Sequence, residues 1–197
     1  MAVIPVDTTT APAPATATET VEIPVAPAEV RALSAVQRRI GRGPVVATAR
    51  GMSLFGEHAG GWLALGLVGA LVDRPRCRDW LTAAAGVAAA HGASIAVKRV
   101  VRRPRPAHPQ VQVLVGTPSR LSFPSAHATS TTAAAVLFGR LLGRRLTPAL
   151  VPPMALSRLV LGVHYPTDVA AGALLGAGVA AAVQKIFGRR LFGRSPR

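Results

Sequence analysis

The chain has 197 residues, of which 50% are hydrophobic and 4% aromatic, with a mean hydropathy of +0.37 and a formal net charge of +15. This composition is more apolar than a soluble domain of this size needs, so a membrane protein must be considered. The single cysteine, Cys77, excludes an intrachain disulfide framework and a thiolate metal site.

The N-terminal part of the chain divides into two regions of different composition. Residues 1–28 are rich in Pro, Thr and Ala and carry no Lys or Arg, which predicts a disordered tail. Residues 29–58 are basic, with arginines spaced among Leu, Val and Ile. We expect them to form an amphipathic helical region at a membrane interface or in an outer helical layer.

Five apolar segments follow, at residues 59–72, 80–97, 126–143, 148–163 and 169–187. Most are shorter than the about 20 residues that cross a bilayer, but they lack the polar faces of a soluble bundle. They are rich in Ala and Gly, whose small side chains let helices approach closely in lipid. The sequence therefore predicts an all-α, polytopic membrane bundle with about five transmembrane helices at residues 59–190, followed by a basic tail at residues 191–197.

Helices that alternate across a membrane would bring three distant stretches to one face. These are "KRVVRRPRP" after the second segment, "PSAH" at the start of the third, and "SRLVLGVHYPTD" between the fourth and fifth. Together they supply cations, two histidines and a carboxylate. We therefore expect an active site at one membrane face.

Asp168 is the only acidic residue after Asp79, and it follows His164 by four positions. On a helix this spacing places both side chains on one face, where the carboxylate can accept the proton of one imidazole nitrogen. The other nitrogen is then free to act as a nucleophile. The alternative role for Asp168 is an N-cap of the fifth helix. With Arg158 in the same stretch, the catalytic interpretation is favoured.

A phosphoryl group is the substrate that these residues predict. Three side chains offer fixed positive charge, and the amides at the start of the third helix favour an anion. Phosphoryl transfer also requires a nucleophile and a proton donor, roles that His164 and His127 can fill. The candidate phosphate-binding residues are Lys98, Arg105, Ser125, Ala126 and Arg158.

Three motifs in this region resemble the signature of the type 2 phosphatidic-acid phosphatase superfamily, the lipid phosphate phosphatases related to vanadium haloperoxidases. They are Lys98, six residues and Arg105-Pro106; Pro124-Ser125-Ala126-His127; and Ser157-Arg158, five residues, His164, three residues and Asp168. The second motif usually has glycine where this chain has Ala126. Helical dihedrals accept a β-carbon, so we expect a slightly narrower pocket and retained activity.

The resemblance implies an integral-membrane phosphatase of the cell membrane that acts on a lipid-linked phosphate without a metal or another cofactor. His164 would attack phosphorus to give a phosphohistidine, and Asp168 would stabilise the imidazolium. His127 would protonate the leaving group and then act as a base on water. Residues 59–190 would be the lipid-phosphatase domain. The sequence leaves the oligomeric state open.

From about Gly51 the chain further resembles short actinobacterial members of this superfamily that dephosphorylate decaprenylphosphoryl-5-phosphoribose in cell-wall arabinan precursor synthesis. The product would be decaprenylphosphoryl ribose. A polyprenyl pyrophosphate or phosphatidylglycerophosphate phosphatase is the alternative. A basic membrane- or nucleic-acid-binding protein without turnover is the alternative of another class. A nucleic-acid partner is not expected, because the chain has few aromatic residues for stacking and its basic residues cluster at helix ends.

Several polar residues lie outside the three motifs. Glu57 and His58, beside the first segment, are candidates for the substrate pocket. His91, within the second segment, is expected to be a buried, hydrogen-bonded histidine. Near the first motif, Arg99, Arg102 and Arg103 are expected to meet anionic lipid head groups at the interface.

Overall fold

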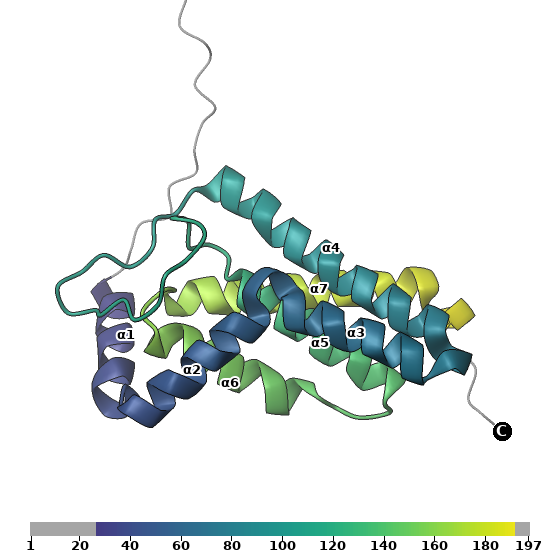
Figure 1. The fold of residues 1–197 in the computed structure, drawn as a ribbon. Helices are drawn as coiled ribbons and strands as arrows, with labels where there is room; N and C mark the ends of the chain where they lie inside the picture. The colour runs from purple at the N-terminus through teal and green to yellow at the C-terminus, as the bar shows by residue number, and fades with distance from the viewer. Residues whose placement is uncertain (1–26, 192–197) are drawn as a thin grey trace, which may run out of the picture.

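The computed structural model describes residues 27–191, so most of the tails predicted at 1–28 and 191–197 lies outside the described residues. Within the described part, residues 27 and 28 belong to the first helix and residue 191 to the last, where tails were predicted. The described chain is helical and contains no strand, only an isolated bridge between Pro104 and Leu121. The all-α prediction is confirmed. The helices are α1 (Pro27–Ile40), α2 (Gly43–Gly56), α3 (Gly60–Val72), α4 (Cys77–Val101), α5 (Ala126–Leu141), α6 (Thr147–Val160) and α7 (Pro166–Leu191), with 3₁₀ turns η1 (Glu57–Ala59) and η2 (Arg74–Arg76) (Figure 1).

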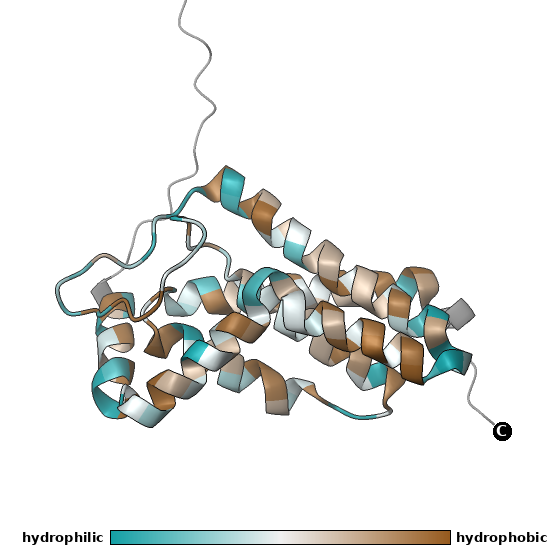
Figure 2. Cartoon of the chain, in the orientation of Figure 1, coloured by the Kyte–Doolittle hydropathy of each residue, from teal (hydrophilic) through white to brown (hydrophobic). Residues whose placement is uncertain are grey.

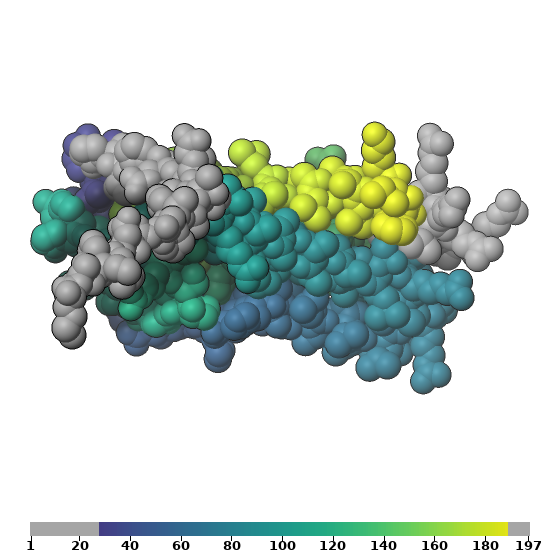
Figure 3. All heavy atoms as spheres, turned by 90° about the horizontal axis from the view of Figure 1, so that it is seen from above, coloured from purple at the N-terminus to yellow at the C-terminus, as the bar shows by residue number. Residues whose placement is uncertain are grey.

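Helix α5 is the centre of an elongated bundle, in which it contacts α4, α6 and α7 (Figure 1). Helices α4 and α7 also lie side by side along the length of the molecule (Figure 3). The core between α3, α4 and α5 is built around Trp62, Trp80 and Phe138. The indole of Trp62 donates a hydrogen bond of 3.1 Å to the Thr131 hydroxyl, so its polar atom is satisfied inside the bundle.

Three helical segments are long and apolar enough to cross a membrane: Gly43–Val72, Arg74–Val101 and Pro166–Gly188. Large apolar side chains on them face outward, and Leu71, Val72 and Leu174 are 72%, 80% and 75% exposed. A surface of this kind suits lipid better than water. Hydrophilic residues gather instead at the two ends of the bundle (Figure 2).

The five apolar segments correspond to α3 through α7, but they differ in length. The first candidate span begins at Gly43 rather than near residue 59, because η1 joins α2 to α3. At this junction His58 and Ala59 have left-handed backbone conformations, with φ of 50° and 59°. Helices α5 and α6, with 16 and 14 residues, are shorter than the about 20 residues of a typical span. Helix α5 is instead enclosed by its neighbours.

Helix α1 lies across one end of the bundle and packs on protein through its apolar side (Figure 1). Leu33 is fully buried there. The amide nitrogen of Gln37 donates to the backbone carbonyls of Gln112 and Val160 at 2.7 and 3.0 Å. Helix α1 therefore fastens the long connection at 102–125 to the end of α6.

Helices α5 and α7 pack closely because α7 carries small residues at the contact. A β-carbon added at Gly176 would collide with the carbonyl oxygen of Thr129, and one added at Gly172 would collide with that of Ser125. Gly178, on the same helix, has no atom within 4 Å of such a β-carbon. The spacing of Gly172 and Gly176 thus lets the two backbones meet.

This contact predicts opposite effects for two matched substitutions on α7. Gly176→Ala is expected to destabilise the protein by about 1–3 kcal/mol, because the helix backbones must move apart. Gly178→Ala is expected to be neutral or to stabilise by up to about 1 kcal/mol through helix propensity. Thermal unfolding in detergent measures both. Equal melting temperatures would contradict the close approach of α5 and α7.

Candidate active site

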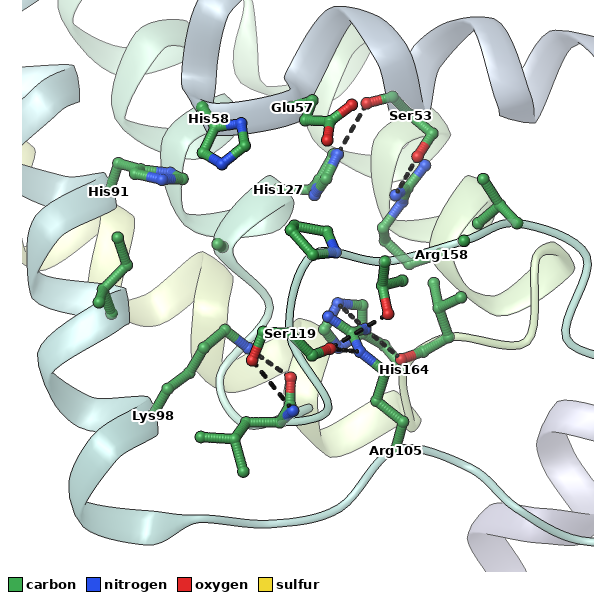
Figure 4. Close-up of a pocket in the computed structure, with 18 of the residues that line it drawn as sticks. Ser53, Glu57, His58, His91, Lys98, Arg105, Ser119, His127, Arg158 and His164 are labelled. Atoms are coloured by element: carbon green, nitrogen blue, oxygen red, sulfur yellow. Dashed lines mark hydrogen bonds between the residues drawn. The ribbon is translucent and has the colours of Figure 1, made fainter.

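A cavity of about 430 Å³ opens at the end of the bundle where α4 ends, α5 begins and α6 leads into α7. The structure thus brings together the helix ends that alternation across the membrane predicted. Helix α2, the turn η1 and residues 115–121 close its other sides. The predicted site residues that line this cavity are Glu57, His58, Lys98, Arg105, Ala126, His127, Arg158 and His164 (Figure 4).

His164 lies between α6 and α7 and is only 2% exposed. Its Nε2 is 3.2 Å from Nη1 of Arg105. A guanidinium can only donate, so Nε2 is the acceptor and Nδ1 carries the proton. Burial lowers the pKa of His164 well below its usual value, and the nearby cations Arg105, Lys98 and Arg158 lower it further. The imidazole is therefore neutral at physiological pH, with an unprotonated Nε2.

Asp168 is fully buried in the first turn of α7. Its Oδ1 accepts a hydrogen bond of 2.8 Å from Arg103, and its Oδ2 accepts one of 2.8 Å from the Tyr165 amide. The second bond is the reciprocal half of a capping box. Oδ2 also lies 3.6 Å from Nδ1 of His164, which is beyond hydrogen-bond range. Catalytic hydrogen bonds are often this long before substrate binds and shorten in the complex.

Helix α2 forms the wall beside His127. Nε2 of His127 lies 2.9 Å from the Ser53 carbonyl oxygen, so this nitrogen carries the proton and donates it. The hydroxyl of Ser53 accepts a hydrogen bond of 3.0 Å from Arg158. Gly56 allows this approach, because a β-carbon there would collide with the ring of His127. Ser53 therefore orients one candidate catalytic histidine and one candidate phosphate ligand.

Lys98 and Arg105 reach the cavity from the end of α4 and the connection after it. Nζ of Lys98 donates to the carbonyls of Leu121 and Ser122 at 3.1 and 3.0 Å. Nε of Arg105 donates to the carbonyl of Ser119 at 2.7 Å. Burial lowers the pKa of Arg105 to about 10, so the guanidinium stays protonated at neutral pH. Both cations are thereby fixed at the edge of the cavity.

The start of α5 places Ser125 and Ala126 differently. Ala126 lines the cavity at a helix N-terminus, where backbone amides favour an anion. Ser125 is fully buried and is not among the residues that line the cavity. Its hydroxyl accepts from the Ala128 amide at 3.4 Å, and its own amide donates to the Asp168 carbonyl at 2.9 Å. Ser125 therefore caps α5 and ties it to α7.

Glu57, His58 and His91 form a polar side of the same cavity (Figure 4). The rings of His58 and His91 have centroids 6.2 Å apart. His91 does not have the hydrogen bonding expected of a core histidine, because its Nδ1 is buried and has no partner among residues 27–191. It lines the cavity two turns of α4 before Lys98. A histidine at this depth in a membrane-spanning helix is a candidate functional residue.

Arg103 contradicts the expectation that it meets lipid head groups. Its side chain is fully buried and pairs with Asp168 at 2.8 Å and with Glu29 of α1 at 2.6 Å. The reason is local: Arg102, with φ of 55°, ends α4 in a left-handed conformation, and the chain after it passes over the start of α7. Arg99 and Arg102 are exposed.

Sequence reasoning missed three residues that hold the site together, Glu29, Ser53 and Arg103. Ser53 gives no sequence signal, because it acts partly through a backbone carbonyl. Arg103 stands in a run of arginines whose members look alike. Glu29 is one of only eight acidic residues in the chain, and that scarcity is the one signal that could have marked it.

A site of this kind binds phosphate esters, because buried cations surround a neutral imidazole that can attack phosphorus. In a helical membrane bundle these features define a membrane-embedded phosphatase. The family model described as the PAP2 superfamily matches residues 79–192. The chain belongs to the PAP2 superfamily, a family of lipid phosphatases.

Curated relatives from two mycobacterial species carry the same name. A decaprenylphosphoryl-5-phosphoribose phosphatase from Mycobacterium tuberculosis is 57% identical over 163 residues, covering 82% of this chain and 92% of the relative. A protein of the same name from Mycolicibacterium smegmatis is 59% identical over 145 residues, covering 73% and 81%. No solved structure matches the chain significantly.

The cap geometry of Ser125 predicts the effect of Ser125→Ala. Loss of the cap is expected to cost about 0.5–2 kcal/mol of stability. The Michaelis constant for a phosphate ester is expected to stay within about twofold, because the hydroxyl faces α5 rather than the cavity. Thermal unfolding and steady-state kinetics measure the two effects. A large rise in KM at unchanged stability would instead make Ser125 a phosphate ligand.

Proposed function

We propose that this protein removes the 5-phosphate of decaprenylphosphoryl-5-phosphoribose at the cell membrane and releases decaprenylphosphoryl ribose and phosphate. The observation that carries the chemistry is the buried, neutral His164 with its unprotonated Nε2 toward Arg105. The choice of substrate rests on the shared name of the relatives. The proposal includes no nucleic-acid partner, because the cations of the site are enclosed by the bundle.

The first step of the proposed reaction is attack by His164 on phosphorus. The substrate phosphate replaces Nε2 of His164 as the hydrogen-bond acceptor of Arg105. The freed lone pair of Nε2 then forms the P–N bond of a phosphohistidine. Asp168 approaches Nδ1 and stabilises the positive charge that develops on the ring. Lys98, Arg105 and Arg158 hold the phosphoryl oxygens, with the amides near Ala126.

His127 moves the protons in both halves of the reaction. Burial and the charge of Arg158 lower the pKa of His127 to about 3, so its ring is neutral before substrate binds and takes up a second proton, at Nδ1, once the phosphate ester neutralises the surrounding cations. The Ser53 carbonyl keeps the other proton on Nε2, and His127 donates from Nδ1 to the leaving ribose oxygen as the P–O bond breaks. Neutral His127 then accepts a proton at Nδ1 from the water that attacks the phosphohistidine. Cleavage of the P–N bond releases phosphate and restores neutral His164.

The polar side of the cavity supports a phosphorylated sugar over the alternative lipid phosphates. Glu57, His58 and His91 offer acceptors and donors for the hydroxyl groups of a ribose whose 5-phosphate lies among the cations. A polyprenyl pyrophosphate has no hydroxyl groups to place there, and the glycerol of phosphatidylglycerophosphate has one, fewer than a ribose. We therefore propose these three residues as sugar ligands. His91 lies within the lipid-phosphatase domain, residues 59–190, and Glu57 and His58 directly precede it.

Phosphate release from a panel of substrates tests the proposed function. The panel is decaprenylphosphoryl-5-phosphoribose, a polyprenyl pyrophosphate and phosphatidylglycerophosphate, each given to the detergent-purified protein with EDTA present. We expect the phosphoribosyl lipid to have the highest kcat/KM, and His164→Ala to abolish release. Preference for another lipid would replace the substrate. Near wild-type activity of His164→Ala would overturn the nucleophile.

The role of His127 predicts an effect that depends on the leaving group. His127→Ala is expected to slow hydrolysis of an alkyl phosphate by about 10²–10⁴-fold, because the alkoxide then leaves without a proton. An aryl phosphate with an acidic phenol should lose far less. Parallel rate measurements on the two esters decide the matter. Equal losses would show that His127 is not the general acid.

A further inference from the structure

Glu29 and Arg103 connect α1 to the buried carboxylate beside His164. Nη2 of Arg103 donates to Oε2 of Glu29 at 2.6 Å, and Nη1 donates to Oδ1 of Asp168 at 2.8 Å. Thr167 completes the connection: its hydroxyl accepts from Arg103 at 2.7 Å and donates to Oε1 of Glu29 at 2.6 Å. The guanidinium also lies 4.5 Å from the centroid of the Tyr165 ring.

This arrangement fixes which oxygen of Asp168 faces the histidine. Arg103 occupies Oδ1, and Oδ2 is left between the Tyr165 amide and Nδ1 of His164. Without an anchor, a buried guanidinium could rotate to take both oxygens in a bidentate pair. Glu29 holds the second terminal nitrogen of Arg103 and prevents this rotation.

Charge gives Glu29 a second effect. Asp168 and Arg103 together carry no net charge, so the pair by itself offers little to a developing imidazolium. Glu29 adds a negative charge and returns the three side chains to a net charge of −1. Although burial raises the pKa of Glu29, hydrogen bonds from Thr167 and Arg103 hold it below its usual value, so the carboxylate is ionised.

We propose that Glu29 is a positioning residue of the phosphatase site. Acting through Arg103, it orients Asp168 toward His164 and supplies the negative charge that stabilises the phosphohistidine-forming transition state. The inference rests on the proposed phosphohistidine mechanism. Glu29 precedes residues 79–192, which the family model matches, so the inference makes α1 part of the catalytic unit.

Vanadate and phosphate binding separate this role from a structural one. Vanadate bonds to a nucleophilic nitrogen in a five-coordinate geometry that resembles the transition state, whereas phosphate occupies the same cations as a product. Glu29→Gln keeps the size of the side chain and removes its charge. We expect it to weaken vanadate inhibition and lower kcat by about 10- to 100-fold, the range known for outer partners of metal-ligating histidines. Phosphate inhibition should change by less than about threefold.

Three further variants complete the design. Asp79→Asn makes the same charge change in the first turn of α4, at the opposite end of the bundle, and should leave both inhibition constants unchanged. Glu29→Asp keeps the charge and should recover part of the vanadate affinity. In an Arg103→Met background Glu29→Gln should have a smaller effect than in the wild type, because Glu29 acts through Arg103.

The outcomes distinguish this inference from the proposed function. If vanadate does not inhibit the wild type, the phosphohistidine mechanism itself fails. If vanadate inhibits the wild type and Glu29→Gln behaves like Asp79→Asn, the positioning role is overturned. The role is also overturned if Glu29→Gln and Glu29→Asp weaken both inhibitors equally and lower the melting temperature, because Glu29 would then only stabilise the fold.

Discussion

Buried positive charge is the constraint on which the architecture of the site depends. Lys98 and Arg158 are 7% and 1% exposed, and cations removed from water must have partners in the protein. Carbonyl oxygens of the connection at 102–125 accept hydrogen bonds from Lys98 and Arg105, and Ser53 of α2 accepts one from Arg158. The long connection and α2 are therefore required electrostatically. They hold the charges apart before any phosphate arrives.

The same cations help to set the protonation state of His164, the proposed nucleophile. Burial and the surrounding positive charge lower the pKa of His164 and keep its ring neutral, and Arg105 identifies which nitrogen lacks a proton. A phosphate ester brings two negative charges into the cavity and pairs with the cations. In the proposed mechanism the ring then accepts the positive charge that attack on phosphorus creates, because Asp168 lies 3.6 Å from Nδ1. Phosphate binding and activation of the proposed nucleophile would thus follow from one charge distribution.

The sequence predicted the helices and the cavity better than it predicted individual contacts. Apolar segments and motif spacing located α3 through α7 and the helix ends that meet, because both depend on periodicity and alternation across a membrane. The prediction that Arg103 meets lipid head groups was wrong, because the residues that follow a helix end take a direction that periodicity does not determine. In the structure Ser125 is the N-cap of α5. Motif spacing alone cannot distinguish this role from that of a phosphate ligand, since both roles favour a serine before a helix.

Asp168 shows why cap and catalytic interpretations need not exclude each other. Its Oδ2 bonds the Tyr165 amide and thereby fixes the first turn of α7, while the same oxygen faces His164. Because this carboxylate is already held rigid by the fold, orienting a histidine costs it no further side-chain conformational entropy. Hydrogen bonds from Arg103 and from the Tyr165 amide compensate the burial of Asp168, and Glu29 binds the same guanidinium from α1. The division between an interfacial N-terminal region and a membrane domain is therefore one of composition, whereas electrostatics unites α1 with the site.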